Sequence, residues 1–314
     1  MIYWRLSPFV LLAVTACSGV DPAQDSAVDP NDDISSASQA LDSRSDRGKP
    51  EPEMLGVHFA KGAASPFGSG SPAMTWHNGT VMNSAAVTAI FWGSKWTDSS
   101  FVQDKISGIQ SFYEGYGDSH YAATSSEYTG SNGSVGTAVT VSNALMDSSA
   151  APTRAPKVSV IAGEVCKMIS APVANGYYPV YIDSKRGSAG YCAWHSYGTC
   201  NNVPVQFAFF FNLDGDAGCD PQDTRPDHSQ GLAALANVSA HELAEAMTDP
   251  RNGGWYDSSG AENGDKCAWT FNVPAVTFLN SSSWKLQGEW SNAAYKAGTG
   301  YPNSKSQLGC LDGF

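Results

Sequence analysis

Apolar runs along the chain predict a series of buried strands. Four runs have the length and the content of β-branched and aromatic residues typical of such strands: Val87–Trp92, Val158–Ile161, Tyr177–Ile182 and Val205–Phe211. After the first run, apolar residues recur at helical spacing from Phe101 to Tyr113. The order predicts a strand, then a helix, then a mainly buried sheet.

A second, longer helix is predicted from about Gln230 to Thr248. Leu232, Leu235 and Leu243 lie on one side of such a helix, and Pro250 ends it. The pattern as a whole predicts an α+β fold, in which helices pack on a mixed β-sheet.

Composition excludes several classes of protein. Of the 314 residues, 42% are hydrophobic and 15% charged, which is enough apolar material for a large globular domain. A net charge of −12 would repel a phosphate backbone, so we expect no nucleic-acid partner. We predict one globular domain over residues 74–314.

The first 17 residues resemble a bacterial lipoprotein signal. Arg5 precedes the apolar run Pro8–Val14, and Val14-Thr15-Ala16-Cys17 follows. We therefore expect export, removal of residues 1–16 and a lipid on Cys17 that anchors the protein to a membrane, at the bacterial outer membrane or cell surface. The alternative is an ordinary secretory signal that leaves Cys17 as a thiol. Residues 18–73, rich in Asp, Ser, Ala and Pro, are predicted to form a disordered tether.

Six cysteines remain once Cys17 is set apart. They are Cys166, Cys192, Cys200, Cys219, Cys267 and Cys310. An even number in an exported chain predicts up to three disulfides, with the pairing left open. The alternative, a zinc site made of thiolates, lacks any C-x-x-C pair.

The sequence His241-Glu242-Leu243-Ala244-Glu245 lies on the second predicted helix. Positions four apart share a helix face, so His241 and Glu245 can hold one metal ion. In HExxH zinc peptidases the glutamate after the first histidine acts on the bound water, and Glu242 has that position here. The alternative is a simple i,i+4 pair on a solvated helix face.

A third ligand is expected from the residues around this helix. Glu262 is the first choice, Asp265 its substitute, and His195 the other candidate, because its imidazole would restore a zinc-like ligand set. Zinc is the expected ion. The carboxylate at position 245 makes the site harder, so manganese and calcium are alternatives.

Several short motifs resemble the EXORDIUM/phosphate-induced protein family. They are Thr75–Val81, Val87–Gly93, Gly176–Ile182, Gly190-Tyr191-Cys192 with His195, Thr248-Asp249-Pro250 and Trp255-Tyr256. The plant members are extracellular, cell-wall-associated growth proteins without an established enzymatic activity. This chain resembles a microbial branch that keeps an HExxE motif. The resemblance implies secretion and a common fold.

Two functions follow as hypotheses. The first is metal-dependent hydrolysis of peptide bonds in a zincin-like layout, with Glu242 as general base and Tyr256 or His195 near the oxyanion. The second is a non-catalytic surface protein that binds cell-wall polysaccharide or protein through its many Trp and Tyr residues, around a structural metal or none.

Overall fold

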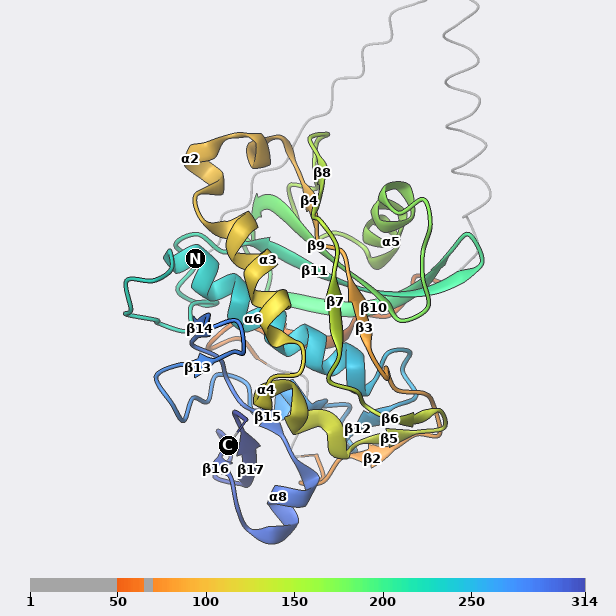
Figure 1. Ribbon diagram of the computed structural model, residues 1–314, viewed down its shortest axis with the longest axis vertical. Coiled ribbons are helices and arrows are strands. Elements are labelled where there is room, and N and C mark those ends of the chain that lie inside the picture. The colour runs from red at the N-terminus through yellow and green to blue at the C-terminus, as the bar shows by residue number, and fades with distance from the viewer. Residues whose placement is uncertain (1–49, 65–69, 314) are drawn as a thin grey trace, which may run out of the picture. The chain divides into compact units, whose positions relative to one another are not determined.

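A mixed β-sheet forms the centre of the computed structural model, which describes residues 50–64 and 70–313 (Figure 1). The strand order is β1-β10-β11-β9-β3-β7, and β4 lies between β9 and β8. β1 and β11 run antiparallel to β10, whereas the pairs of β9 with β11, β3 and β4 are parallel. The strands are β1 (Leu55–Phe59), β3 (Ala85–Val87), β4 (Ile90–Trp92), β7 (Val139–Val141), β8 (Leu145–Asp147), β9 (Gly176–Lys185), β10 (Tyr191–Cys200) and β11 (Val203–Asn212). The predicted α+β class with a mixed sheet is confirmed.

Helices and small ladders surround this sheet. The helices are α2 (Ser99–Val102), α3 (Lys105–Tyr116), α4 (His120–Ala123), α5 (Val158–Met168), α6 (Gln230–Thr248), α7 (Asn263–Lys266) and α8 (Asn292–Ala297), with 3-10 turns η1 (Ser94–Thr97) and η2 (Thr124–Glu127). The short ladders pair β2 (Thr75–Trp76) with β12 (Trp255–Tyr256), β5 (Thr129–Gly130) with β6 (Gly133–Ser134), β13 (Val276–Thr277) with β14 (Ser283–Trp284), and β17 (Leu308–Leu311) with both β15 (Glu289–Trp290) and β16 (Tyr301–Pro302).

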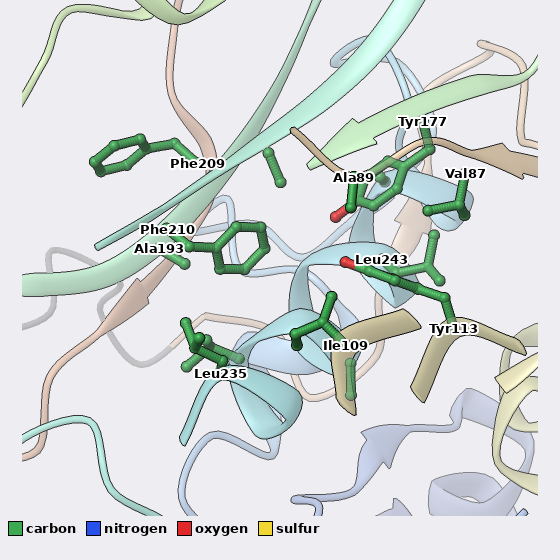
Figure 2. Close-up of a cluster of buried hydrophobic side chains, with 14 of the residues drawn as sticks. Val87, Ala89, Ile109, Tyr113, Tyr177, Ala193, Phe209, Phe210, Leu235 and Leu243 are labelled. Atoms are coloured by element: carbon green, nitrogen blue, oxygen red, sulfur yellow. The ribbon is translucent and has the colours of Figure 1, made fainter. Parts of the chain in front are cut away.

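The main core lies between the sheet and the helices α3 and α6. Figure 2 shows Leu235 and Leu243 of α6 near Ile109 of α3 and Phe210 of β11, and all four side chains are fully buried or nearly so. The opposite sheet face packs on α5, and Trp194 stacks there on Phe209 at 5.3 Å between ring centroids. Neighbouring residues on a strand point to opposite faces. His195, next to Trp194, therefore points to the face that α6 covers.

Helix α6 is the central helix of the fold. The side chain of Ser229 caps its N-terminus by accepting a hydrogen bond from the backbone N–H of Leu232. Every residue from Gly231 to Thr248 is buried. The HExxE residues therefore lie inside the protein, and the alternative of an ion pair on a solvated helix face is wrong.

The sequence pattern was misleading in two places. Val158–Ile161 belongs to α5 and not to a strand, because Val158, Ile161 and Val165 form one buried helical face. The predicted helix from Phe101 is divided between α2 and α3, where Gln103 has a φ of 49°. The pattern also missed β10, in which His195, Ser196 and glycine interrupt the apolar residues.

The folded part begins earlier than the predicted boundary at Met74. Residues from Glu51 onward form one compact unit, and β1 lies within the segment predicted to be a tether. The polar composition of residues 18–53 hid a short strand immediately after it. The predicted signal peptide, Cys17 and residues 18–49 lie outside the described residues.

Three disulfides link the six cysteines of the domain. The pairs are Cys166–Cys200, Cys192–Cys219 and Cys267–Cys310. This confirms the prediction of a disulfide-bonded domain and fits an oxidising, extracellular environment. Within residues 50–64 and 70–313, no helix has the length and apolar content needed to cross a bilayer.

Candidate metal centre

Helix α6 brings three candidate residues to the middle of the protein. His241, Glu242 and Glu245 are each 0% exposed. Nε2 of His241 lies 3.0 Å from Oε2 of Glu245, yet neither atom has a hydrogen-bond partner among the described residues. Both oxygens of Glu242 are likewise without one. These are orphaned polar atoms at a depth where such atoms are costly unless something binds them.

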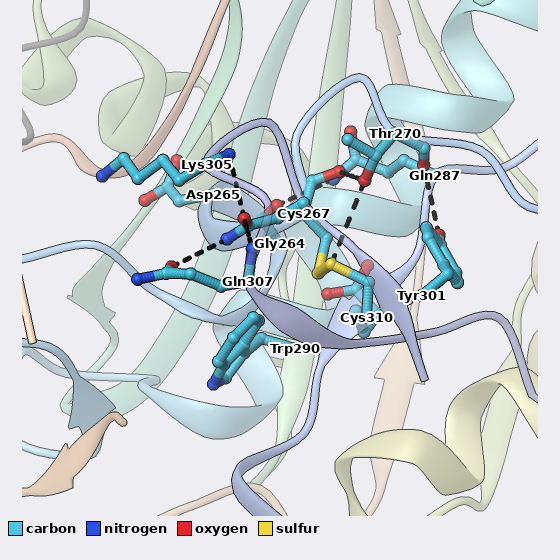
Figure 3. The surroundings of a disulfide bond; sticks show 12 residues. Gly264, Asp265, Cys267, Thr270, Gln287, Trp290, Tyr301, Lys305, Gln307 and Cys310 are labelled. Atoms are coloured by element: carbon cyan, nitrogen blue, oxygen red, sulfur yellow. Dashed lines mark hydrogen bonds between the residues drawn. A yellow bond between two sulfur atoms is a disulfide. The ribbon is translucent and has the colours of Figure 1, made fainter. Parts of the chain in front are cut away.

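The loop around α7 adds two carboxylates. The backbone N–H of Asp265 donates to Oε1 of Glu245 at 2.8 Å, which leaves Oε2 free, and Oδ1 of Asp265 lies 3.8 Å from Nε2 of His241. The backbone N–H of Glu262 donates to Oδ2 of Asp265 at 3.1 Å. Figure 3 shows that the Cys267–Cys310 disulfide directly follows this loop and holds it to β17.

His195 of β10 completes the group from the sheet side. Its Nε2 atom lies 3.3 Å from Oε1 of Glu262, and its ring is 0% exposed. The donors form two triads that share Glu245: His195 with Glu262, and His241 with Asp265. Within each triad the ligand atoms lie no more than 4.8 Å apart. All five residues that the sequence suggested as ligands are therefore brought together.

The donor chemistry fits a divalent cation. Ligand atoms about 2.0–2.2 Å from zinc lie within this range of one another, and imidazole and carboxylate are zinc ligands. Because Glu245 belongs to both triads, a single ion could be held by either one.

Burial dominates the electrostatics of the centre. It raises the pKa of Glu245 from 4.5 to about 8, and it raises the pKa values of Glu242, Glu262 and Asp265 well above their ordinary range, with further repulsion from Glu245 in each of these three. Without a cation these carboxylates tend to keep their protons. A divalent cation would favour their charged forms.

The imidazoles are neutral for the same reason. Burial lowers the pKa of His195 to about 4 and that of His241 to about 3. A metal ligand must offer an unprotonated ring nitrogen, so both histidines are suited to the role at neutral pH.

Two residues that the sequence did not suggest surround His241. Nδ1 of His58, on β1, lies 2.8 Å from Nδ1 of His241, and Nε2 of Gln287 lies 2.9 Å from the same atom. Gln287 also donates to the backbone oxygen of Gly264 at 2.9 Å. These contacts hold the ring of His241 at Nδ1. Because the amide of Gln287 is a donor, it places the ring proton on Nε2, and binding of a metal at Nε2 requires that Nδ1 carry the proton and donate it to His58 instead. No spacing rule links positions 58 and 287 to the HExxE motif, so only the fold could reveal them.

Two glycines allow the backbone to approach the centre closely. A Cβ at Gly56 would lie 2.0 Å from Oε2 of Glu245 and 2.6 Å from Nε2 of His195. A Cβ at Gly264 would lie 2.7 Å from Nδ1 of His241. Any other residue at either position would displace the candidate ligands.

Tyr256 lies at the border of the centre. It lines a cavity of about 220 Å³ together with Glu262, and its ring stacks on His77 at 3.5 Å between centroids. The backbone of β12 pairs with β2 and holds it there. The tyrosine is thus close to one triad through a shared cavity.

Comparison with known proteins adds no homologue: no protein-family model matches the chain, and no curated protein or solved structure is significantly similar to it. The function must be argued from the centre itself.

Proposed function

We propose that this protein is an exported metal-dependent hydrolase that cleaves peptide bonds. One observation carries the proposal: Nε2 of His241 and Oε2 of Glu245 lie 3.0 Å apart without hydrogen-bond partners, on the same helix as the equally unpartnered carboxylate of Glu242. In this account His241, Glu245 and Asp265 hold a zinc ion, and His195 and Glu262 are the donors on the other side of Glu245.

A zinc ion bound there would polarise a substrate carbonyl and lower the pKa of a water molecule. Glu242 removes the proton from the attacking water and passes it to the leaving amine. Burial raises the pKa of Glu242, so its carboxylate is a stronger base than that of an exposed glutamate. The hydroxyl of Tyr256 is the proposed donor to the developing oxyanion, from the cavity that it shares with Glu262.

Casein hydrolysis by the zinc-loaded full-length chain tests the proposal. We expect activity that a chelator removes and that zinc restores. A chain that contains zinc but cleaves neither casein nor a mixed peptide library would contradict the proposed reaction while leaving the metal centre in place.

The second candidate is a non-catalytic cell-surface protein of EXORDIUM type that binds polysaccharide or protein around a structural ion. Burial favours it, because His195, His241 and Glu245 are 0% exposed and Glu262 is 3% exposed. Structural metal sites are typically closed, whereas catalytic sites keep an open position. If the chain contains its full amount of metal and cleaves no peptide even when the centre has been made accessible to solvent, that result would support this candidate.

We also propose that Cys17 carries a lipid that anchors the protein to the membrane. The motif Val14-Thr15-Ala16-Cys17 supports this, and the three disulfides fit the oxidising side of a membrane. Membership of the EXORDIUM family stays a hypothesis that rests on the short motifs alone.

A further inference from the structure

We propose that an extended polypeptide binds along the edge of β10 beside the candidate metal centre, and that β1, Leu55–Phe59, is an internal occupant of this place that must leave before a substrate can enter. The inference rests on the proposed function, because it names the substrate class of the same centre and the segment that blocks it. Four features of β1 support it.

The first feature is the position of β1 at the edge of the sheet. Among the strands that the structure describes it is the last in the order, and it pairs there only with β10, antiparallel, with Leu55 opposite His195. The edge of β10 therefore offers backbone N–H and C=O groups to an added strand. Extended peptides bind proteins by adding a strand to such an edge.

The second feature is contact with the candidate ligands. Gly56 lies against Glu245 and His195, and the ring of His58 lies 4.0 Å from that of His241 between centroids. One short segment thus covers both histidines of the centre.

The third feature is a pair of cavities that have β1 and its continuation as a wall. One, of about 220 Å³, is lined by Leu55, Gly56 and Val57 and reaches Glu262. The other, of about 410 Å³, is lined by Phe59, Ala60 and Lys61 and reaches Asp265. Phe59 lines both. Each cavity is thus lined by a carboxylate of one triad, as expected if β1 divides a single groove.

The fourth feature is the residue that β1 presents to the centre. Gly56 has a φ of 44° and no side chain, so the strand passes over Glu245 without displacing it. A larger side chain at this position would conflict with the ligand atoms. Gly56 is therefore the position at which docking of β1 can be weakened without substituting a candidate ligand, and the new side chain also presses on Glu245 and His195.

The first experiment changes Gly56 to Val in the full-length chain. Gly187→Val is the matched control, because Gly187 also has a positive φ, 60°, but a Cβ there meets no atom within 4 Å. We expect Gly56→Val to transfer zinc to a coloured chelator, and to cleave a fluorogenic peptide, about tenfold faster than Gly187→Val, because the open state becomes more populated. Equal rates in the two folded variants would overturn the proposal.

A second experiment leaves every residue of β1 and of the centre unchanged, so it decides the question if Gly56→Val does not fold or disturbs Glu245 and His195 directly. A recognition sequence for a site-specific protease is inserted after Gly62, where a Cβ would meet no atom within 4 Å, and the folded chain is then cut. The same insertion after Gly187 controls for cutting itself. Release of the segment that ends at Gly62 should accelerate both zinc transfer and peptide cleavage about tenfold, and a synthetic peptide of residues 51–61 should reverse both effects.

The outcomes distinguish this inference from the proposed function. If the cut chain binds zinc but transfers it no faster and cleaves no faster than the intact chain, β1 is an ordinary structural strand and the inference is wrong. If zinc transfer accelerates but no peptide is cleaved, the covering role of β1 stands and the hydrolase function is wrong. If neither form binds zinc, both are wrong.

Discussion

His241 and Glu245 lie one helical turn apart with Nε2 and Oε2 separated by 3.0 Å, yet the two atoms form no hydrogen bond. Both are fully buried. Two complementary groups at hydrogen-bond distance normally satisfy each other in a protein interior. Here they converge beside Asp265, which is the arrangement expected of ligands around a cation.

Glu242→Gln separates the base from the ligands. The substitution keeps the size of the side chain and removes the proton acceptor, so folding and zinc content should be retained. Peptide hydrolysis should fall by about a hundred- to ten-thousand-fold, the usual contribution of general-base assistance. Zinc analysis and a casein assay on the same preparation measure both quantities.

Glu245→Gln is the matched variant, one turn further along α6. It removes the ligand that both triads share, so zinc and activity should be lost together. Wild-type hydrolysis in Glu242→Gln would rule out the proposed mechanism, whatever happens in Glu245→Gln.

The Cys267–Cys310 disulfide should support the metal centre directly. Cys267 follows the last residue of α7, which carries Asp265, and Gln287 lies close to this disulfide (Figure 3). Gln287 contacts both the backbone oxygen of Gly264 and the ring of His241. Replacing both cysteines with alanine should therefore weaken zinc binding at least about tenfold. Substitution of residues that orient metal ligands typically has an effect of this size.

The Cys166–Cys200 pair provides the control for that prediction. Its sequence separation of 34 is close to the 43 of Cys267–Cys310, so its removal should cost a similar amount of stability, about 3–4 kcal/mol. Zinc affinity, measured by competition with a chelator, should stay near that of the wild type. Equal losses of affinity in both double variants would show that only general stability matters.

The metal-free protein should lose stability between about pH 6.5 and pH 8. Folded Glu245 keeps its proton up to about pH 8, while the unfolded chain, with a pKa of 4.5, has released it. The folded state is therefore penalised as the pH rises, by up to about 1.4 kcal/mol per pH unit for each such carboxylate. His195 and His241 are neutral in the folded state but half protonated at pH 6.5 in the unfolded chain, so their opposing contribution fades as the pH rises through this interval.

Zinc should remove this pH dependence, because a cation stabilises the charged carboxylates. Thermal unfolding with and without a chelator at several pH values measures it. A zinc-loaded protein whose Tm falls as steeply as that of the metal-free protein would contradict this account of the centre.

Cys17→Ser should release the protein from membranes. The lipid expected on Cys17 is the proposed anchor, and the hydroxyl of serine does not replace it in that modification. Fractionation of expressing bacteria into membrane and soluble parts gives the result. If the variant and the parent are equally soluble, the lipoprotein prediction is wrong.

The sequence predicted helix α6 and the candidate ligand residues more accurately than the strand and the loop that bring these residues together. Helix α6 has the predicted bounds, Gln230–Thr248, because its apolar periodicity, its cap at Ser229 and Pro250 all agree. Glu262, Asp265 and His195 were identifiable as residue types near the motif or between cysteines. Their convergence depended on β10 and on the α7 loop, which have no strong local pattern.

The closure of the centre could not be predicted from local pattern at all. β1 has only five residues and follows a polar segment. Its relation to the centre becomes visible only in the contacts of Gly56 and His58 with residues far away in the chain. Long-range pairing of this kind depends on the whole sheet. The error in placing the domain boundary at Met74 and the failure to identify His58 have this common cause.

The metal content of the purified full-length chain tests the central claim most directly. Wild type, His241→Ala and His228→Ala are equilibrated with zinc, freed of excess and analysed; His228 serves as control because it lies outside both triads and bonds to the backbone oxygen of Ser283. We predict stoichiometric zinc in the wild type and in His228→Ala, and its loss in His241→Ala. A wild type that takes up no divalent cation, or a His241→Ala variant that retains the full amount, would contradict the account.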